Sequence, residues 1–504
     1  MTAAQDLNAP VRIPKNRVKS VAIIGAGASG SVAVDVFNKE GYDKIKVFER
    51  RGDVSGVWHL DSKVDEIPVA PGSNETKNDE QLEIPIELET QNEVFKPRST
   101  VPRFIYTPAY ENIRTNVPEH FMTFSDKPTW PGLDQPDVDP FTLRKYVDQY
   151  IQEYIEPNKE FLTLNTTLEK VDKDYSDPDS KFTLTLRTET NEKDSEGNLL
   201  DRWFKEKFDA LVLANGHYHV PHIPYVEGLN KVIAKFPERV KYAKQFRHDP
   251  FYKDKTVLVV GGSASGIDIS YVLTKVAKKV YRSQPTKSWE ERQKQGRFVL
   301  LIDQQTELKP TITRYELNDK DEIIAHFEDG SIVSNPDYII YGTGYDYSYP
   351  FLRHLFPDFS DEGVYLPHSF QHTFHIQDPL ISTLGVPVGA LSFRAFEYQS
   401  ILISRFLSGK IALPSINEQY KWVHEREERI GKIRGYHRIG GENVVGYLQD
   451  LTELGGGVEQ IDGTGRLFPI VTQEQVDEWA ERKSKLVNKW EADVQGATQG
   501  IENL

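Results

Sequence analysis

The sequence predicts an α/β fold with two dinucleotide-binding, Rossmann-like domains, the second inserted in the first. Two glycine-rich turns, at residues 21–30 and 256–266, each follow a short apolar strand and open a helix. Two further apolar strands, at residues 208–217 and 337–345, each end at a glycine that lets the backbone approach another domain. They bracket the second turn, as an insertion of the second unit within the first would produce.

The first turn has the form of a pyrophosphate site. Its backbone N–H groups and the following helix dipole are suited to a pyrophosphate, and the residues we expect to contribute are Gly25, Gly27, Ala28, Ser29 and Gly30. Glu49 ends the next strand about 20 residues later, where a carboxylate accepts ribose hydroxyls. Because a carboxylate would repel a 2′-phosphate, this turn predicts FAD.

The second turn has the same form with one departure. Its expected phosphate-binding residues are Gly261, Gly262, Ser263, Ala264, Ser265 and Gly266. Ser263 replaces the middle glycine and is small enough to lie near a pyrophosphate. Arg282 ends the next strand, where the first unit has an acid, and an arginine pairs well with a 2′-phosphate. We therefore expect NADPH rather than NADH; the alternative for Arg282 is an ordinary basic surface patch.

The domain boundaries follow from these elements. We assign residues 1–220 to the first part of an FAD-binding domain, 221–340 to the NADPH-binding domain, and 341–504 to the second part of the FAD-binding domain with C-terminal helices. Residues 60–100 form an acidic, proline-broken insertion. We interpret it as an elaborated surface loop, with a functional lid as the alternative.

The composition bounds the possible functions. The chain has 504 residues, a net charge of −15 and no Lys/Arg stripe, which argues against binding nucleic acid. It has no cysteine, so disulfide reductase chemistry, thiolate nucleophiles and zinc–thiolate sites are excluded. No apolar run approaches the length of a membrane span and the first residues carry no secretion signal, so we expect a cytoplasmic protein without a membrane anchor.

Two further patterns, a histidine cluster and a C-terminal helix face, have simpler structural explanations. His217, His219 and His222 lie close together, but in a proline-containing loop without an obvious carboxylate, and we expect no metal there. Residues 472–475 fit a capping box, and one face of the helix beyond carries Val476, Trp479, Leu486, Val487 and Trp490. That face predicts packing on the chain's own body, with a homodimer contact as the alternative.

Taken together, the motifs resemble the flavin-containing monooxygenases of the fungal type, which are class B flavoprotein monooxygenases. The resemblance extends over about residues 21–415. Besides the two turns, the segments that carry it lie at 51–58, 115–118, 122–126, 216–218, 327–330, 343–345 and 413–415. No single one of these is specific, but the combination is.

The resemblance implies a set of site residues. Asn116 is the expected catalytic residue, placed near the flavin and the oxygen site; the alternative is a structural asparagine in the turn before Pro118. Residues 374–375 and 397–399 resemble late segments that close over the flavin ring. The further cofactor-binding residues that the resemblance implies are Arg50, Gly56, Val57, Trp58, Thr115, Leu168, Gly216, Thr343, Gly344 and Gln399.

The resemblance also implies a reaction. NADPH reduces FAD, O₂ adds as a flavin C4a-hydroperoxide, and one oxygen passes to a small soft nucleophile, an amine nitrogen or a sulfur. The family's identifying stretch, F-x-G-x-x-x-H-x-x-x-F/Y, is altered here, because Glu238 and Tyr242 replace its glycine and histidine between Phe236 and Phe246. This change leaves open the alternative of an NADPH oxidase that releases hydrogen peroxide. A Baeyer–Villiger monooxygenase acting on ketones is a further alternative, although the related Baeyer–Villiger enzymes end this stretch in a tryptophan and Phe246-Arg247 does not.

Overall fold

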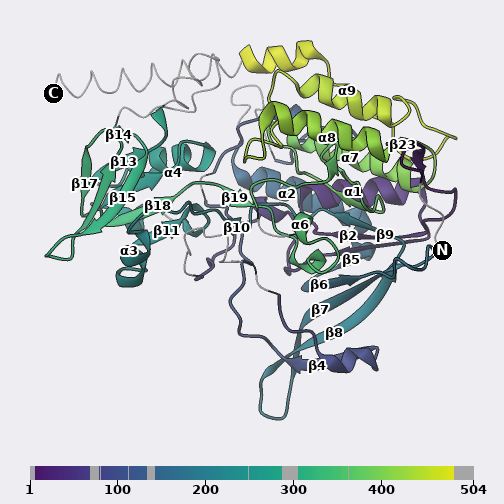
Figure 1. The fold of residues 1–504 in the computed structure, drawn as a ribbon, viewed down its shortest axis with the longest axis horizontal. Coiled ribbons are helices and arrows are strands. Elements are labelled where there is room, and N and C mark those ends of the chain that lie inside the picture. Colours follow the sequence, from purple (N-terminus) through teal and green to yellow (C-terminus); the bar gives the residue numbers. More distant parts are fainter. Residues whose placement is uncertain are drawn as a thin grey trace.

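The computed structural model describes residues 6–67, 79, 81–111, 113–132, 142–247, 249–286, 305–360 and 363–481. Figure 1 shows two lobes joined near β10 and β19, with the C-terminal helices over the larger lobe. The helices are α1 (Ala28–Glu40), α2 (Arg144–Ile155), α3 (Leu229–Lys235), α4 (Ala264–Thr274), α6 (Pro357–Ser360), α7 (Ser392–Leu407), α8 (Ile416–Ile430) and α9 (Val444–Leu454).

The larger lobe is built on a sheet of seven strands among the described residues. Its strands, in spatial order, are β20 (Ser369–Phe370), β21 (Phe374–His375), β22 (Ile381–Thr383), β9 (Ala210–Leu213), β2 (Ser20–Ile24), β3 (Lys44–Phe48) and β5 (Leu162–Thr163). The five strands from β22 to β5 run parallel. Both β2 and β9 are buried along their whole length, as parallel strands covered on both faces must be.

Alternate residues of this sheet pack into two different cores. Val21, Ile23 and Val212 lie in a core with α1, α2, α7 and α9. Ala22 and Leu211 lie in the other core, against an antiparallel sheet of four strands. These strands are β4 (Glu93–Pro97), β8 (Leu199–Phe208), β7 (Phe182–Lys193) and β6 (Thr166–Asp172).

The interpretation of residues 60–100 as a surface loop is wrong in part. Residues 93–97 form β4, which pairs with β8 in register from Glu93 opposite Phe204 to Pro97 opposite Leu200. Val94 and Leu88 are buried with Trp203 in a small separate core. The proline-broken composition hid a strand whose pairing partner lies a hundred residues later in the chain. Residues 68–78 and 80 of this segment lie outside the described residues.

The smaller lobe has a parallel sheet of five described strands. In spatial order they are β11 (Val240–Tyr242), β18 (Tyr338–Tyr341), β12 (Thr256–Val260), β13 (Lys279–Ser283) and β14 (Thr306–Lys309). Helix α4 covers one face. The other face carries α3 and a small antiparallel sheet of β15 (Ile312–Leu317), β16 (Ile323–Phe327) and β17 (Ile332–Ser334).

The chain enters and leaves the smaller lobe at one place. There β10 (Val220–Pro221) pairs antiparallel with β19 (Tyr345–Asp346). The two connections therefore lie side by side, next to the sheet formed by residues between them (Figure 1). This arrangement agrees with the expected α/β fold of two dinucleotide-binding units; the domain boundaries at 220 and 340 stay a prediction.

The C-terminal part packs on the larger lobe (Figure 1). The strand β23 (Ala412–Ser415) pairs with β1 (Pro10–Arg12) near the start of the chain. The expected capping box at 472–475 is present: the Thr472 N–H donates to Gln475 Oε1 at 3.0 Å and the Gln475 N–H to Thr472 Oγ1 at 3.3 Å. Trp479 of this helix packs on Phe121, which supports packing on the chain's own body. Residues 482–504 lie outside the described part of the chain.

Among the residues that the structure describes, no helix has both the length and the apolar character needed to cross a bilayer.

Candidate cofactor and active site

A long cavity opens along the carboxyl ends of β2, β3 and β9. The expected site residues that line it are Gly25, Gly27, Ala28, Ser29, Glu49, Arg50, Gly56, Val57, Trp58, Asn116, Leu168 and Gly216. These residues come from five separate stretches of sequence. The structure therefore gathers most of the first predicted set around one space, at the edge of a parallel sheet where such folds bind ligands.

The first glycine turn needs glycine for steric reasons. Gly25 has φ +104°, and a Cβ there would lie 2.6 Å from the Ala214 oxygen. A Cβ on Gly30 would lie 1.9 Å from the Gly25 oxygen, so a side chain at 30 displaces the turn. The middle glycine, Gly27, is the N-cap of α1 and no side chain caps this helix end. The first N–H groups of α1 consequently stay available to an anion in the cavity.

Glu49 is held where its carboxylate faces the cavity. The Ala26 N–H donates to Glu49 Oε2 at 2.8 Å and the Arg51 N–H donates to Oε1 at 3.0 Å. Each carboxylate oxygen accepts more than one hydrogen bond, so capacity for ribose hydroxyls remains. Two backbone donors fix the orientation that such recognition requires.

The segment after β3 covers the first turn. The Ser55 N–H donates to the Ala26 oxygen at 3.1 Å. Gly56 has φ +54°, and a Cβ there would come within 3.0 Å of Gly27 Cα. Arg51 supports this segment from behind through an ion pair with Asp61 at 2.9 Å. The first turn is thereby enclosed, with Gly25 and residues 28–30 buried.

Some predicted residues lie behind the wall of the cavity. Gly30 is buried beneath the turn, and Thr115 exchanges hydrogen bonds with Thr142. Gln399 is fully buried in α7, where its Oε1 accepts the N–H of the wall residue Gly385 at 3.1 Å. His375 is buried at the sheet edge and does not line the cavity, contrary to the expectation for residues 374–375. These residues act on the cavity only through neighbours.

The structure adds polar residues that the motifs did not single out as site residues. Asn215 Oδ1 and His217 Nε2 are buried at the cavity and no described residue hydrogen-bonds to either atom. Burial, together with the neighbouring His219, lowers the pKa of His217 to about 3, so its ring is neutral at neutral pH. The signal for both was their position directly after β9, next to Gly216. Unsatisfied buried polar atoms of this kind point to a ligand as the missing partner.

The acidic insertion also contributes to the cavity. Asp79 lines it and is buried, where Ser348 Oγ donates to Asp79 Oδ2 at 2.9 Å and His219 Nε2 lies 3.5 Å away. Burial raises the pKa of this carboxyl, but His219 and Arg103 outweigh that effect and hold the pKa below its usual value. Residues around Asp79 are outside the described chain, so the lid alternative stays a prediction.

The second glycine turn has the same backbone form as the first, but it is exposed where the first turn is buried. Gly261 has φ +133°, and a Cβ there would lie 2.3 Å from the Gly342 oxygen. A Cβ on Gly266 would lie 2.1 Å from the Gly261 oxygen. Ser263 is the N-cap of α4, again with no side-chain cap, and both Ser263 and Ala264 are exposed. This turn does not line the cavity of the first.

Arg282 does not occupy the position in the second unit that Glu49 has in the first. The Gly25 N–H donates to the oxygen of Phe48, directly before Glu49, and the Gly261 N–H donates to the oxygen of Ser283, directly before Gln284. The residue that corresponds to Glu49 is therefore Gln284, whose Oε1 lies 2.5 Å from the Cβ site of Gly262. Arg282 lies two residues earlier, opposite Val259 and Leu308, and is 1% exposed. Its role toward a 2′-phosphate stays a prediction.

Thr343 and Gly344 lie at the junction of the lobes. Thr343 Oγ1 donates to the His222 oxygen, and the His222 N–H donates to the Gly344 oxygen at 2.9 Å. Gly344 has φ +90°. Both residues make hydrogen bonds beside β10 and β19, where the chain passes between the lobes. Neither lines the cavity.

The altered stretch 236–246 holds Asp65, a residue of the acidic insertion, by hydrogen bonds and an ion pair. Tyr242 OH and Gln245 Nε2 donate to the Asp65 oxygen at 3.3 and 2.8 Å. Lys244 Nζ lies 2.5 Å from Asp65 Oδ2, and both side chains are 1% exposed. Burial lowers the pKa of Lys244 to about 8 although Asp65 opposes it. The same Asp65 accepts the N–H groups of Ile105 and Tyr106, which line the cavity.

Comparison with known proteins decides the family. A family model for flavin-binding monooxygenase-like proteins matches residues 301–461, and one for pyridine nucleotide-disulphide oxidoreductases matches residues 205–373. The flavin-containing monooxygenase FMO GS-OX-like 9 of Arabidopsis thaliana is 30% identical over 425 residues, which cover 82% of this chain and 80% of the relative. The chain belongs to the flavin-containing monooxygenase family.

A second curated relative supports the family, and a solved structure supports the fold. The flavin-containing monooxygenase iboF of Amanita muscaria (strain Koide BX008) is 28% identical over 83% of this chain and 84% of its own length. The structure of S-allyl-L-cysteine S-oxygenase from Allium sativum has the same fold, with a TM-score of 0.66 at 23% identity, covering 93% of this chain and 92% of that one. The match to the disulphide oxidoreductase model reflects the shared fold, because this chain has no cysteine.

A flavin-containing monooxygenase uses FAD and NADPH, and the residues present fit both groups. For FAD, the fit rests on the enclosed first turn, the open end of α1, the oriented Glu49 carboxylate and the unsatisfied Asn215 and His217 atoms. For NADPH, it rests on the exposed second turn and the neutral Gln284, which does not repel a 2′-phosphate. The protein is accordingly a flavin-dependent oxidoreductase.

Proposed function

We propose that this protein is an NADPH- and O₂-dependent monooxygenase that oxygenates a small soft nucleophile, an amine nitrogen or a sulfur. The observation that carries this proposal is the part of the cavity lined by two elements, which we call its two walls. One wall is Asn116, Val117 and Met122, and the other is Ser392, Phe393 and Phe396 of α7. These six side chains include no acid, base or ionisable nucleophile.

An apolar wall of this kind limits the chemistry that the protein itself supplies. With no general acid or base among these six residues, activation of the substrate by proton transfer is not available from them. The substrate must therefore bring its own reactive electron pair, as neutral amines and sulfides do. Phe393 and Phe396 exclude water, and Asn116 offers a neutral amide hydrogen bond.

The cofactors carry the redox step. When bound, FAD supplies the chemistry that takes a hydride from NADPH and passes two electrons to O₂, so that one oxygen atom enters the substrate and the other leaves as water. The chain's own part is to bind and orient: the end of α1 would hold the pyrophosphate, Glu49 would hold the ribose, and the two walls would keep water out.

The test measures products together with cofactor use. We expect an oxygenated amine or sulfide in proportion to the NADPH consumed, with O₂ required. Asn116→Ala is expected to leave reduction of the flavin by NADPH near normal and to raise the share of electrons that leave as hydrogen peroxide. Collapse of flavin reduction in this variant would instead make Asn116 a structural residue.

The altered stretch 236–246 favours a second candidate, an NADPH oxidase that releases hydrogen peroxide. Glu238 and Tyr242 replace the glycine and histidine of the family's stretch, and Tyr242 is engaged with the Asp65 backbone. Equal amounts of peroxide and consumed NADPH, unchanged by any amine or sulfide, would identify this activity. A lactone or ester product from a cyclic or linear ketone would instead identify the Baeyer–Villiger alternative.

A further inference from the structure

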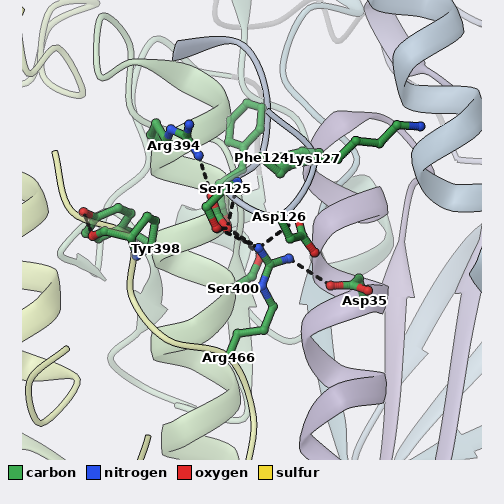
Figure 2. A network of polar contacts seen from close by, with 12 residues as sticks. Asp35, Phe124, Ser125, Asp126, Lys127, Arg394, Tyr398, Ser400 and Arg466 are labelled. Atoms are coloured by element: carbon green, nitrogen blue, oxygen red, sulfur yellow. Dashed lines mark hydrogen bonds and ion pairs between the residues drawn. The ribbon is translucent and has the colours of Figure 1, made fainter. Parts of the chain in front are cut away.

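A buried polar network joins the two elements that carry the walls of the cavity. Figure 2 shows Arg466 with its guanidinium group between α7 and α1. Arg466 comes from the segment after α9 and its side chain is 7% exposed. Its Nη1 donates to Asp35 Oδ2 of α1 at 2.8 Å and to Tyr154 OH of α2 at 2.7 Å. Its Nη2 donates to Ser125 Oγ at 3.1 Å and pairs with Glu397 of α7.

Glu397 ties α7 to the segment that contains Asn116. Its carboxylate is fully buried and accepts the Ser125 N–H at 3.1 Å and the Ser125 hydroxyl. Arg394, one turn earlier, pairs with Glu397 at 3.1 Å and donates through Nη2 to the His120 oxygen at 2.8 Å. Figure 2 shows Arg394, Ser125 and Arg466 pointing toward one another next to α7.

The two elements joined in this way are the two walls. The first turns of α7 present Ser392, Phe393 and Phe396 to the cavity, and the segment before Ser125 presents Asn116 and Met122. Arg466, Glu397 and Ser125 do not line the cavity themselves. The network therefore sets the spacing of the walls without contact with a ligand.

The charges of the network require an arginine at its centre. Burial lowers the pKa of Arg466, but Glu397, Asp126 and Asp35 outweigh burial and hold the pKa above its ordinary value. Only a planar guanidinium donates in several fixed directions at once, here toward α1, α2, α7 and the wall segment. Lys39 pairs with both Asp35 and Asp126, so these carboxylates keep a cation if Arg466 is replaced.

We propose that Arg466 and Glu397 are positioning residues that fix the distance between the two cavity walls. A segment remote from both glycine turns then controls how well the substrate and the flavin ring are aligned. The kinetic part of this inference rests on the proposed function; its spectroscopic part does not.

The test compares two buried arginines that anchor the same C-terminal segment. Arg405 of α7 donates to the oxygens of Gly455, Gly457 and Glu459, and to the backbone oxygen of Arg466 at 3.3 Å. Within the described part of the chain, its side chain has no hydrogen bond to Glu397 or to the wall residues. Arg405→Met therefore loosens the segment alone, whereas Arg466→Met also removes the link to Glu397. FAD is bound to each variant, and the visible circular dichroism of the flavin, peroxide release and steady-state kinetics are measured.

We expect Arg466→Met to change the flavin dichroism and to lower kcat by about 10- to 100-fold, with more peroxide per NADPH and an unchanged KM for NADPH. Arg405→Met is expected to lower the melting temperature but to keep the wild-type dichroism and kcat. Arg466→Lys is expected to restore part of the lost rate, and Arg466→Met/Glu397→Gln to match the single variant, because the pair acts as a unit.

Equal effects of Arg466→Met and Arg405→Met on dichroism and kcat would overturn the inference and leave Arg466 a purely structural anchor. If Arg466→Met does not fold, the same measurements are made on Glu397→Gln. This variant keeps the side-chain volume of Glu397 but removes the negative charge that pairs with Arg466. Wild-type protein that binds FAD but oxygenates nothing would contradict the proposed function, and the dichroism of the variants would still test the positioning role.

Discussion

The two glycine turns share a backbone and differ in what covers them. The first is closed by Ser55 and Gly56, and its helix start is buried. The second carries Ser263 in place of the middle glycine and exposes it. An enclosed turn suits a cofactor that stays bound through many cycles, whereas an open turn suits a cosubstrate that must leave after each one. This difference supports the proposal that FAD binds at the first turn and NADPH at the second.

The largest expected effect comes from filling the first turn. Gly30→Ala places a methyl group 1.9 Å from the Gly25 oxygen, so the turn must move. We expect protein without bound FAD and a loss of about 1–3 kcal/mol of folding free energy. Flavin absorbance per polypeptide and the melting temperature measure both effects.

The matched change in the second turn sharpens this comparison. Gly266→Ala creates a similar clash, 2.1 Å from the Gly261 oxygen. Because this turn is open and separate from the cavity, FAD should stay bound while the KM for NADPH rises. Loss of FAD from both variants alike would break the distinction between the turns.

Glu49 and Gln284 follow the second strand of the first and second units, and the difference between them should determine which nucleotide the second unit prefers. Gln284→Glu introduces the carboxylate that Glu49 supplies in the first unit. It should repel the 2′-phosphate and lower kcat/KM for NADPH relative to NADH by about tenfold, equivalent to 1.4 kcal/mol. Steady-state rates with the two nucleotides measure the ratio, and an unchanged ratio would show that Gln284 does not face the nucleotide.

Replacement of Arg282 tests whether this buried residue binds the 2′-phosphate, as the sequence predicts. Arg282→Ala is expected to raise the KM for NADPH much more than the KM for NADH if the guanidinium reaches the 2′-phosphate. Equal changes for both nucleotides, with a lower melting temperature, would make this residue part of the sheet interior only.

The buried histidines of the larger lobe make its stability depend on pH. Burial lowers the pKa of His217 and His375 to about 3, and it lowers those of His372 and His437 well below 6.5. The unfolded chain binds protons near 6.5 that the folded chain does not, so stability is full above that pH and falls below it. Each histidine contributes up to about 1.4 kcal/mol per pH unit. The melting temperature should fall between pH 7 and pH 5, and less so in His375→Phe; an identical fall would contradict this account.

The sequence predicted what depends on local spacing and missed what depends on distant partners. The glycine turns, Glu49 and the capping box at 472–475 follow from spacings within a few turns or one strand-helix unit, so they were found. The strand β4, the buried Asp79 and the Arg466 network depend on partners far away in sequence. Gln284 was missed because its correspondence to Glu49 comes from the strand register, which the spacing of motifs does not show.

The central claim is that one polypeptide carries FAD at the first turn and takes electrons from NADPH at the second. The most direct measurement is the absorbance of the purified protein during anaerobic titration with NADPH, followed by addition of O₂. The account predicts a yellow protein, bleaching by one NADPH per flavin, and return of colour with O₂. A protein that stays colourless after soaking with FAD, or a bound flavin that NADPH does not bleach, would contradict it.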